Sequence, residues 1–226
     1  APANRTFEHA REWVKKGHKV TVVTCAPNFP DGKLHKGYKN NLISKETIDD
    51  INVWRVKTYI TPNEGFFKRS LDYVSFMFSS SIFGLFTKNV DIIIGTSPQF
   101  FTVISSWFLS KVKRVPFVFE LRDIWPASIT AVGAMKQNFV IKLFEKIELF
   151  LYDEAKLIIS VTESFKDDLE KRGVKREKIK VIHNGVDLKR FNKKLNQDNT
   201  YIEKFNLEDK FIVGYIGTLG LAHSIE

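Results

Sequence analysis

The sequence of 226 residues contains one cysteine, Cys25, which excludes a disulfide framework and a metal site built from several thiolates. Its five histidines are never paired at the i, i+4 spacing that helical zinc sites use. The P-loop, the Gly-x-Gly-x-x-Gly fingerprint and the Gly-x-Ser-x-Gly nucleophile elbow are also missing. We therefore expect no metal and no bound cofactor.

Long hydrophobic runs are scarce as well. Residues 73–87 are uncharged, but these 15 residues fall short of the roughly 20 that a membrane span needs. Residues 92–110 are uncharged too, but Gly95-Thr-Ser-Pro98 interrupts them and favours a strand, a turn and a helix. The first residues already include charged side chains, unlike a secretory signal. We expect a cytoplasmic protein that can lie peripherally on the inner face of the cell membrane.

Acidic residues are in the minority: 26 Asp and Glu stand against 35 Lys and Arg, a net charge of +9. Residues 1–113 hold 16 basic and 9 acidic residues, or +7 of that total. Such an excess attracts phosphate, whether in a nucleotide, a nucleic acid or an anionic lipid. The aromatic residues fall in core-like runs instead of alternating with basic ones, so we expect no nucleic-acid partner.

Hydrophobic periodicity predicts strands that alternate with helices, which indicates an α/β protein with a doubly wound parallel sheet. Six strands are expected before Asn184. These strands span residues 19–25, 52–57, 91–95, 115–120, 156–161 and 178–183. The helices span residues 3–16, 66–88, 99–111, 136–153 and 163–171.

The long helix at residues 66–88 is apolar on more than one side. Leu71, Phe78 and Ile82 share one stripe with other apolar residues, so this stripe is expected to face the core. Two further aromatic residues lie off the stripe, and two basic residues stand at the helix start. Either the helix is simply buried, or these four residues meet a membrane or a lipid acceptor. They are Phe76, Phe83, Lys68 and Arg69.

Residues 189–200 contain few core-forming side chains and mark a boundary. We expect one domain over residues 1–191, a linker over 192–209, and the beginning of a second, incomplete domain over 210–226. A doubly wound domain normally opens on a strand that feeds a phosphate-facing loop, whereas this chain opens on a helix. The sequence is accordingly expected to be a fragment that lacks its first strand.

Charged residues follow directly after the apolar strand at residues 115–120. Glu120, Arg122 and Asp123 lie where parallel strands end, the edge at which such sheets bind ligands. Burying these groups is costly unless they are solvated, paired or used. One interpretation is an ion pair, Glu120 with Arg122, that only ties the loop. The other is a site in which Asp123 carries the principal role.

Two loops allow a structural and a functional interpretation alike. Gly217-Thr-Leu-Gly220 follows a predicted strand and can present backbone N–H groups to a diphosphate, or it can be a simple turn. His183-Asn-Gly-Val-Asp187 carries the Asn-Gly signature of a turn after a strand.

Taken with their order and spacing, five segments of the chain resemble the family 4 glycosyltransferases of the GT-B fold. Within that family the sequence is most similar to bacterial surface-polysaccharide enzymes of the fucosamine and colanic-acid type. The segments are residues 4–6 with 17–23, residues 24–30, residues 95–98, residues 119–126, and residues 183–187 with Phe191. Residues 217–223 then look like the opening of the second domain.

The resemblance implies transfer of a sugar from a nucleotide-sugar donor to a lipid-linked or saccharide acceptor, with retention of configuration and without a metal. The N-terminal domain of the family holds the acceptor, and its C-terminal domain holds the nucleotide. Arg122 and Asp123 match the loop that touches the transferred sugar, where many relatives have His-Asp, so the role of that His does not carry over. The donor domain is largely missing, so the chain alone is not expected to be a complete catalyst.

The resemblance also implies residues that bind the donor. The start of the first helix matches the segment beside the glycine loop that reaches the donor phosphates, and residues near the end match the donor-phosphate loop of the second domain. The donor-binding residues implied are Asn4, Arg5, Gly217, Thr218 and Gly220.

Two alternatives stay open. Another GT-B enzyme, such as a sugar-nucleotide epimerase, would need carboxylates and a His elsewhere, and Arg122-Asp123-Ile-Trp125 is not its usual pattern. A non-enzymatic membrane-surface module would use the basic excess without any chemistry. Lipid flotation compared with DNA retention would separate the membrane and nucleic-acid versions of such a module.

Overall fold

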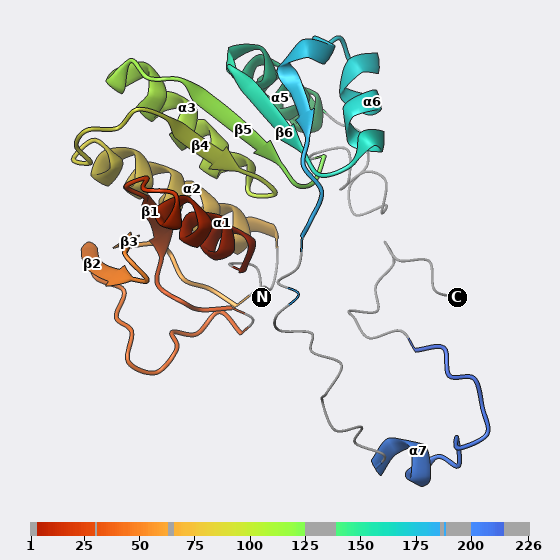
Figure 1. Cartoon of the computed structure of the whole chain (residues 1–226). Helices are drawn as coiled ribbons and strands as arrows, with labels where there is room; N and C mark the ends of the chain where they lie inside the picture. The colour runs from red at the N-terminus through yellow and green to blue at the C-terminus, as the bar shows by residue number, and fades with distance from the viewer. Residues whose placement is uncertain are drawn as a thin grey trace.

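The computed structural model describes residues 4–29, 31–62, 66–124, 139–185, 188 and 200–214 (Figure 1). Strands and helices alternate along the chain, which confirms the predicted α/β class. The strands are β1 (Thr21–Cys25), β2 (Ile43–Ile48), β3 (Ile51–Val56), β4 (Ile93–Thr96), β5 (Phe117–Leu121), β6 (Leu157–Ser160) and β7 (Ile179–Val181). The helices are α1 (Asn4–Lys15), α2 (Phe66–Gly84), α3 (Phe100–Lys113), α5 (Phe139–Glu154), α6 (Glu163–Lys171), the 3-10 turn η1 (Arg176–Lys178) and α7 (Thr200–Lys204).

The strands form two sheets. Four parallel strands in the order β4-β5-β6-β7 make the larger sheet, as a Rossmann-like domain requires. In the smaller sheet, with the order β1-β3-β2, β1 and β3 are parallel and β2 is antiparallel to β3. Every residue of β5 is buried, because β5 has a strand on each side and lies within the main core.

Strand β2 was not predicted. Its central residues are polar and exposed, so it lacks the apolar alternation that indicates a strand. A two-residue turn joins it to β3, and both turn residues, Asp49 and Asp50, have positive φ angles of 48° and 61°. Hairpin turns of this kind usually carry Asn-Gly or Asp-Gly, so Asp-Asp gave a weak signal.

Helices α2, α3 and α5 lie side by side as one layer (Figure 1). Small residues allow α2 and α3 to approach: the Ser80 and Ser105 hydroxyls are 2.8 Å apart, and Gly84 lies against Leu109. Aromatic pairs join α3 to α5, with ring centroids of Trp107 and Phe150 5.3 Å apart. On the side of the sheet, α5 packs through Tyr152, whose ring lies 4.8 Å from that of Phe119 in β5.

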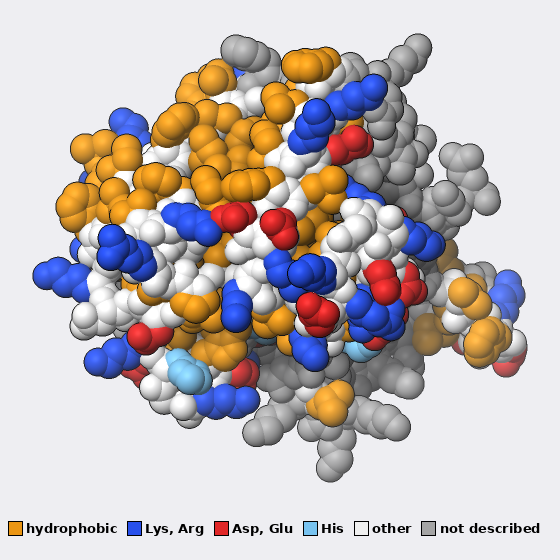
Figure 2. All heavy atoms as spheres, turned by 90° about the horizontal axis from the view of Figure 1, so that it is seen from above, with side chains coloured by type: hydrophobic (Ala, Val, Ile, Leu, Met, Phe, Trp, Pro, Cys, Tyr) orange, Lys and Arg blue, Asp and Glu red, His pale blue; other side chains and the backbone are white. Residues whose placement is uncertain are grey.

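The prediction for the faces of α2 was wrong. Phe76, expected at a membrane, is only 8% exposed, and Phe83 is partly buried. Phe78 and Ile82, expected in the core, are 58% and 54% exposed. The reason is that the small residues Ser80 and Gly84 of α2 face α3 and Phe76 is buried, so the stripe of largest apolar residues is left outside. In the view from above, hydrophobic side chains gather over a broad area with Lys and Arg around it (Figure 2).

The segment before Gly217, where a strand was predicted, forms no strand over its described residues 210–214. The described residues do not include most of the predicted linker, residues 192–199. They also leave out Gly217, Thr218 and Gly220, so the domain boundaries remain a prediction. Among the helices described, none combines the length and the apolar character that crossing a membrane requires.

The carboxyl group of Asp72, on the sheet side of α2, is half-buried, and burial raises its pKa to about 6 from the usual 3.8. The folded state thus holds this proton more tightly than the unfolded state. Ionisation of Asp72 therefore destabilises the fold, fully above about pH 6 and not at all below about pH 3.8. We expect Asp72→Asn to raise the melting temperature at pH 7.5 and to lose this advantage as the pH falls toward 4.

Thermal unfolding followed by circular dichroism at both pH values measures this effect. Asp91→Asn, which neutralises an exposed aspartate, serves as the matched control and should shift the melting temperature little at either pH. A melting temperature for Asp72→Asn at or below that of the wild type at pH 7.5 would contradict the expectation.

Candidate active site

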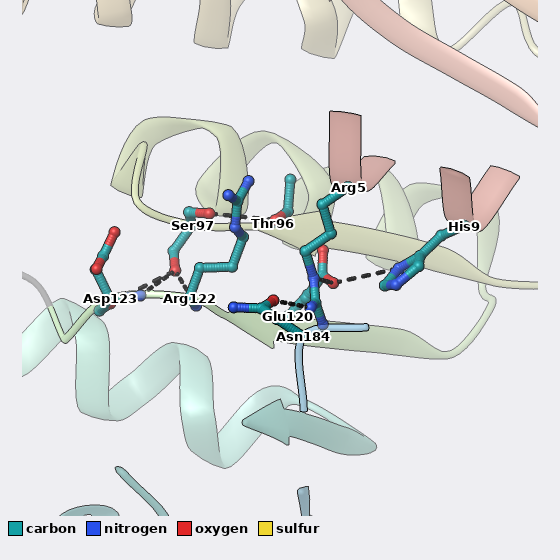
Figure 3. A network of polar contacts seen from close by, with 8 residues as sticks. All are labelled: Arg5, His9, Thr96, Ser97, Glu120, Arg122, Asp123 and Asn184. Atoms are coloured by element: carbon teal, nitrogen blue, oxygen red, sulfur yellow. Dashed lines mark hydrogen bonds and ion pairs between the residues drawn. The ribbon is translucent and has the colours of Figure 1, made fainter. Parts of the chain in front are cut away.

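Polar side chains from four parts of the chain meet at the carboxyl ends of β4 and β5 (Figure 3). This is the edge at which open α/β sheets bind ligands. Two of the residues come from the first turns of α1, two from the end of β4, three from β5 and the loop after it, and one from the loop after β7. They are Arg5, His9, Thr96, Ser97, Glu120, Arg122, Asp123 and Asn184.

Glu120 is the centre of one group. Its side chain is 8% exposed, and its Oε1 accepts a hydrogen bond of 2.8 Å from Arg5 Nε and lies 3.6 Å from His9 Nδ1. The predicted pair of Glu120 with Arg122 is therefore corrected: the partner of Glu120 is Arg5. Strand β5 ends at Leu121, so the chain turns before Arg122, whose guanidinium lies toward Thr96 in Figure 3.

One N–H group of the Arg5 guanidinium is left without a hydrogen bond among the described residues. Its side chain is 9% exposed; Nε is used by Glu120, and Nη1 donates to the Asn184 side-chain carbonyl. Nη2 is buried and has no hydrogen-bond partner within the part of the chain that the structure describes. An unsatisfied buried donor costs about 1–3 kcal/mol, and more when it is charged. The arrangement therefore favours an acceptor, in particular an anionic oxygen, beside Nη2.

Asn184 reaches Arg5 because the loop after β7 is fixed at its start. Ile182 N donates to Ser160 O over 2.8 Å, and the His183 ring nitrogen Nδ1 lies 3.1 Å from Val161 O. Both contacts hold the first residues of the His183-Asn184-Gly185 turn against the end of β6. The sequence marked this segment as a turn, but nothing in it indicated a contact with a residue 179 positions earlier.

His9 was missed by sequence reasoning. Burial lowers the pKa of its imidazole, the charge of Arg5 lowers it further, and the charge of Glu120 opposes both. The ring is therefore neutral at pH 7 and can donate one hydrogen bond and accept another. Its spacing of four residues from Arg5 places both side chains on one face of α1, and that i, i+4 pair was the available signal.

Ser97 holds the loop that carries Asp123. Its backbone N–H donates to Glu120 O over 2.9 Å, and its Oγ accepts from the backbone N–H groups of Arg122 and Asp123 over 2.8 and 3.4 Å. The peptide bond from Ser97 to Pro98 is cis. Ser97 lies in the segment Gly95-Thr-Ser-Pro98, and the sequence alone gave it no role. In the structure it joins the ends of β4 and β5 through these hydrogen bonds.

Asp123 itself is exposed. Burial raises the pKa of its carboxyl group, and the charge of Arg122 opposes this rise. In Figure 3 its carboxylate points away from the Arg5–Glu120 pair, on the other side of Ser97. The edge therefore carries two groups: a buried cation with its carboxylate, and a separate, more accessible carboxylate that can accept hydrogen bonds from hydroxyl groups.

The other predicted site residues divide by location. Asn4 is exposed at the start of α1, next to Arg5. Lys68 and Arg69 are exposed on the first turn of α2, where Arg69 Nη2 donates to Tyr73 Oη over 3.1 Å, and neither belongs to the network of Figure 3. No cluster of three or more His, Cys, Asp or Glu side chains able to hold a metal occurs among the described residues.

The parallel sheet and the helices around it define a Rossmann-like domain, and its polar groups gather at the edge where such sheets bind ligands. Residues 3–190 match the family described as Glycosyltransferase Family 4. This match covers most of the chain, so the protein belongs to glycosyltransferase family 4. The family is one of glycosyltransferases, enzymes that transfer a sugar from a donor to an acceptor. No curated protein matches the sequence.

Proposed function

We propose that the chain is the acceptor-side part of an enzyme that transfers a sugar from a nucleotide sugar to a lipid-linked or saccharide acceptor in surface-polysaccharide synthesis. Residues 1–191 form the acceptor domain in this proposal, and a donor domain begins near residue 210, with Gly217, Thr218 and Gly220 at the donor phosphates. The observation that supports the proposal best is the free, buried donor Nη2 of Arg5 at the carboxyl edge of the sheet.

Arg5 suits the chemistry of a diphosphate leaving group. When the bond between the sugar C1 and the phosphate oxygen breaks, its electron pair leaves with the nucleoside diphosphate, and negative charge grows on that oxygen. A fixed cation stabilises such charge more in the transition state than in the ground state. Arg5 stands on the first turn of α1, and the N-terminal end of a helix carries a positive partial charge, so Asn4 and Arg5 lie at one electropositive corner.

Glu120 acts on Arg5 and not on the sugar. Its buried carboxylate fixes the direction of the guanidinium by accepting the hydrogen bond from Nε, which leaves Nη2 free to point to the ligand. His9 limits the room for Glu120 on the other side, at 3.6 Å. Glu120 and His9 are therefore positioning residues in this proposal.

Asp123 is proposed to hold the transferred sugar. Its exposed carboxylate can accept hydrogen bonds from sugar hydroxyls, and these bonds are strong because one partner is charged. In a retaining transfer the departing phosphate oxygen can take the proton of the acceptor hydroxyl, so the protein need not supply a base. The positive charge of the preceding residue, Arg122, favours the ionised form of Asp123.

The experiment that tests the proposal uses the complete enzyme with UDP- and GDP-sugars and a lipid extract as the source of acceptor. We expect transfer that continues in the presence of EDTA, and a product whose anomeric configuration, measured by NMR, equals that of the donor. Inversion, or activity only with an added divalent cation, would contradict the retaining, metal-independent mechanism. Conversion of a sugar nucleotide to its epimer without any acceptor would favour the epimerase alternative.

A further inference from the structure

The layer of α2, α3 and α5 has an apolar outer face. Its members are large hydrophobic side chains that are exposed although they stand on regular helices of the domain. We call this surface the α2–α3–α5 face. It consists of Leu71, Phe78, Ile82, Leu85 and Phe86 of α2 and its end, Phe108 and Val112 of α3, and Phe139, Leu143 and Phe150 of α5.

These side chains are left outside because other residues of the same helices are buried, as Ile141, Leu151 and Tyr152 are on α5. On α2, Phe76 is buried and Ser80 contacts Ser105. On α3, Val103 is fully buried and Ser106 lies against Gly95 of β4. Phe108 stands five residues from Val103, about 140° further around the helix, and therefore on the outside.

A continuous apolar area of this kind needs a partner, since single domains rarely expose large apolar patches without a function. Figure 2 shows hydrophobic side chains over a broad part of the surface, with Lys and Arg and a few Asp and Glu at its margins. The area is spread over three helices, so it is too broad to be a groove for one peptide. It suits a broad partner with a polar outer layer and an apolar interior.

The charges at the margin decide which partner fits. Exposed cations stand on or next to the three helices: Lys68 and Arg69 on α2, Lys88 after it, Lys111 on α3, Arg114 after it, and Lys142 and Lys146 on α5. Lys111 is paired with Glu154 over 2.5 Å, and the exposed acids Asp91 and Asp153 also lie on or next to these helices, so the cations remain in excess. The buried acid of α5, Glu148, is turned inward to Arg172 and Tyr152. A second copy of the chain would bring two basic margins together, whereas an anionic lipid surface is complementary to them.

We propose that the α2–α3–α5 face lies on an anionic phospholipid membrane, with its apolar side chains among the headgroups and its lysines at lipid phosphates. Lys142 and Lys146 stand among the apolar residues of α5, the arrangement of helices that lie in a membrane surface. Helix α3 begins directly after β4, at the carboxyl edge that carries Ser97, so a membrane along this face borders the site. The inference rests on the proposed function, because it assumes that the acceptor is linked to a lipid in this membrane.

The test is flotation of the complete enzyme with vesicles of phosphatidylcholine and phosphatidylglycerol, and with vesicles of phosphatidylcholine alone. We expect binding to the anionic vesicles that weakens with salt. Phe78→Asp with Ile82→Asp should lower the bound fraction at least ~10-fold, because both charges would enter the apolar layer. Lys142→Gln with Lys146→Gln should lower binding to anionic vesicles by about the same factor.

The matched control is Leu34→Asp with Leu42→Asp, which adds the same two charges at exposed leucines outside the face and should bind like the wild type. Equal binding by the Phe78/Ile82 variant and the wild type, or an equal loss in the control, overturns the proposal. So does a wild-type dimer in analytical ultracentrifugation that this variant dissociates, because the face would then be a contact between copies.

Transfer to a water-soluble acceptor separates this inference from the proposed function. The Phe78/Ile82 variant should keep that activity and lose transfer to acceptor lipid in vesicles. A complete enzyme that binds vesicles but transfers no sugar to any acceptor would contradict the proposed function and leave the membrane face standing.

Discussion

Replacing Arg5 by Gln in the complete enzyme should lower kcat by about 10²–10³-fold, the effect of removing one donor to a developing oxyanion. The expectation follows from the free Nη2 atom, which is buried at the carboxyl edge while Nε and Nη1 are held by Glu120 and Asn184. Steady-state kinetics with the donor varied would measure the effect. Arg5→Lys keeps a charge but loses the fork, so we expect it to recover only part of the activity.

The single variant leaves Glu120 buried without its cation, and breaking such a pair costs about 3–5 kcal/mol of stability. A loss of activity could then follow from unfolding alone. The double variant Arg5→Gln with Glu120→Gln separates the two causes, because two amides can still hydrogen-bond while no charge is buried. We expect it to recover thermal stability but not turnover. Wild-type kcat in a stably folded double variant would show that Arg5 only holds the fold together.

The contrast between Arg5 and the strands shows what the sequence could predict. Periodicity located β5, and its five buried residues follow from an unbroken apolar run. It also placed Glu120 at the carboxyl edge, since a charged residue ends that run. The partner of Glu120 lies 115 residues away, and no local pattern identifies a contact between the start of a helix and the end of a distant strand.

The errors on α2 have a related cause. A helix that is apolar on several sides gives no single stripe, so periodicity cannot say which side meets the sheet. The small residues of α2 determine which side packs inward. Ser80 and Gly84 allow α3 to approach, and the bulky stripe with Phe78 is left outside. In β2, polar exposed residues are held as a strand by pairing with β3, which overrides their weak propensity.

Asp123→Asn in the complete enzyme should lower turnover about 10- to 100-fold, the worth of a hydrogen bond to a charged group. Asp123 is the accessible carboxylate of the edge, whereas the Glu120 side chain is 8% exposed and is occupied by Arg5. The isosteric variant keeps the loop, since Ser97 Oγ holds the backbone N–H of residue 123 and not its side chain.

Glu120→Gln is the matched control, because it also removes one carboxylate charge at the same edge. Its amide oxygen can still accept the hydrogen bond from Arg5 Nε, so we expect a smaller loss of kcat than for Asp123→Asn, together with a lower melting temperature from the weakened buried pair. Turnover of Asp123→Asn within about threefold of the wild type, which is under about 1 kcal/mol of barrier, would remove Asp123 from the site. Abolished turnover in a stable Glu120→Gln variant would transfer the role to Glu120, because a residue that only orients Arg5 is replaceable by an amide that accepts the same bond.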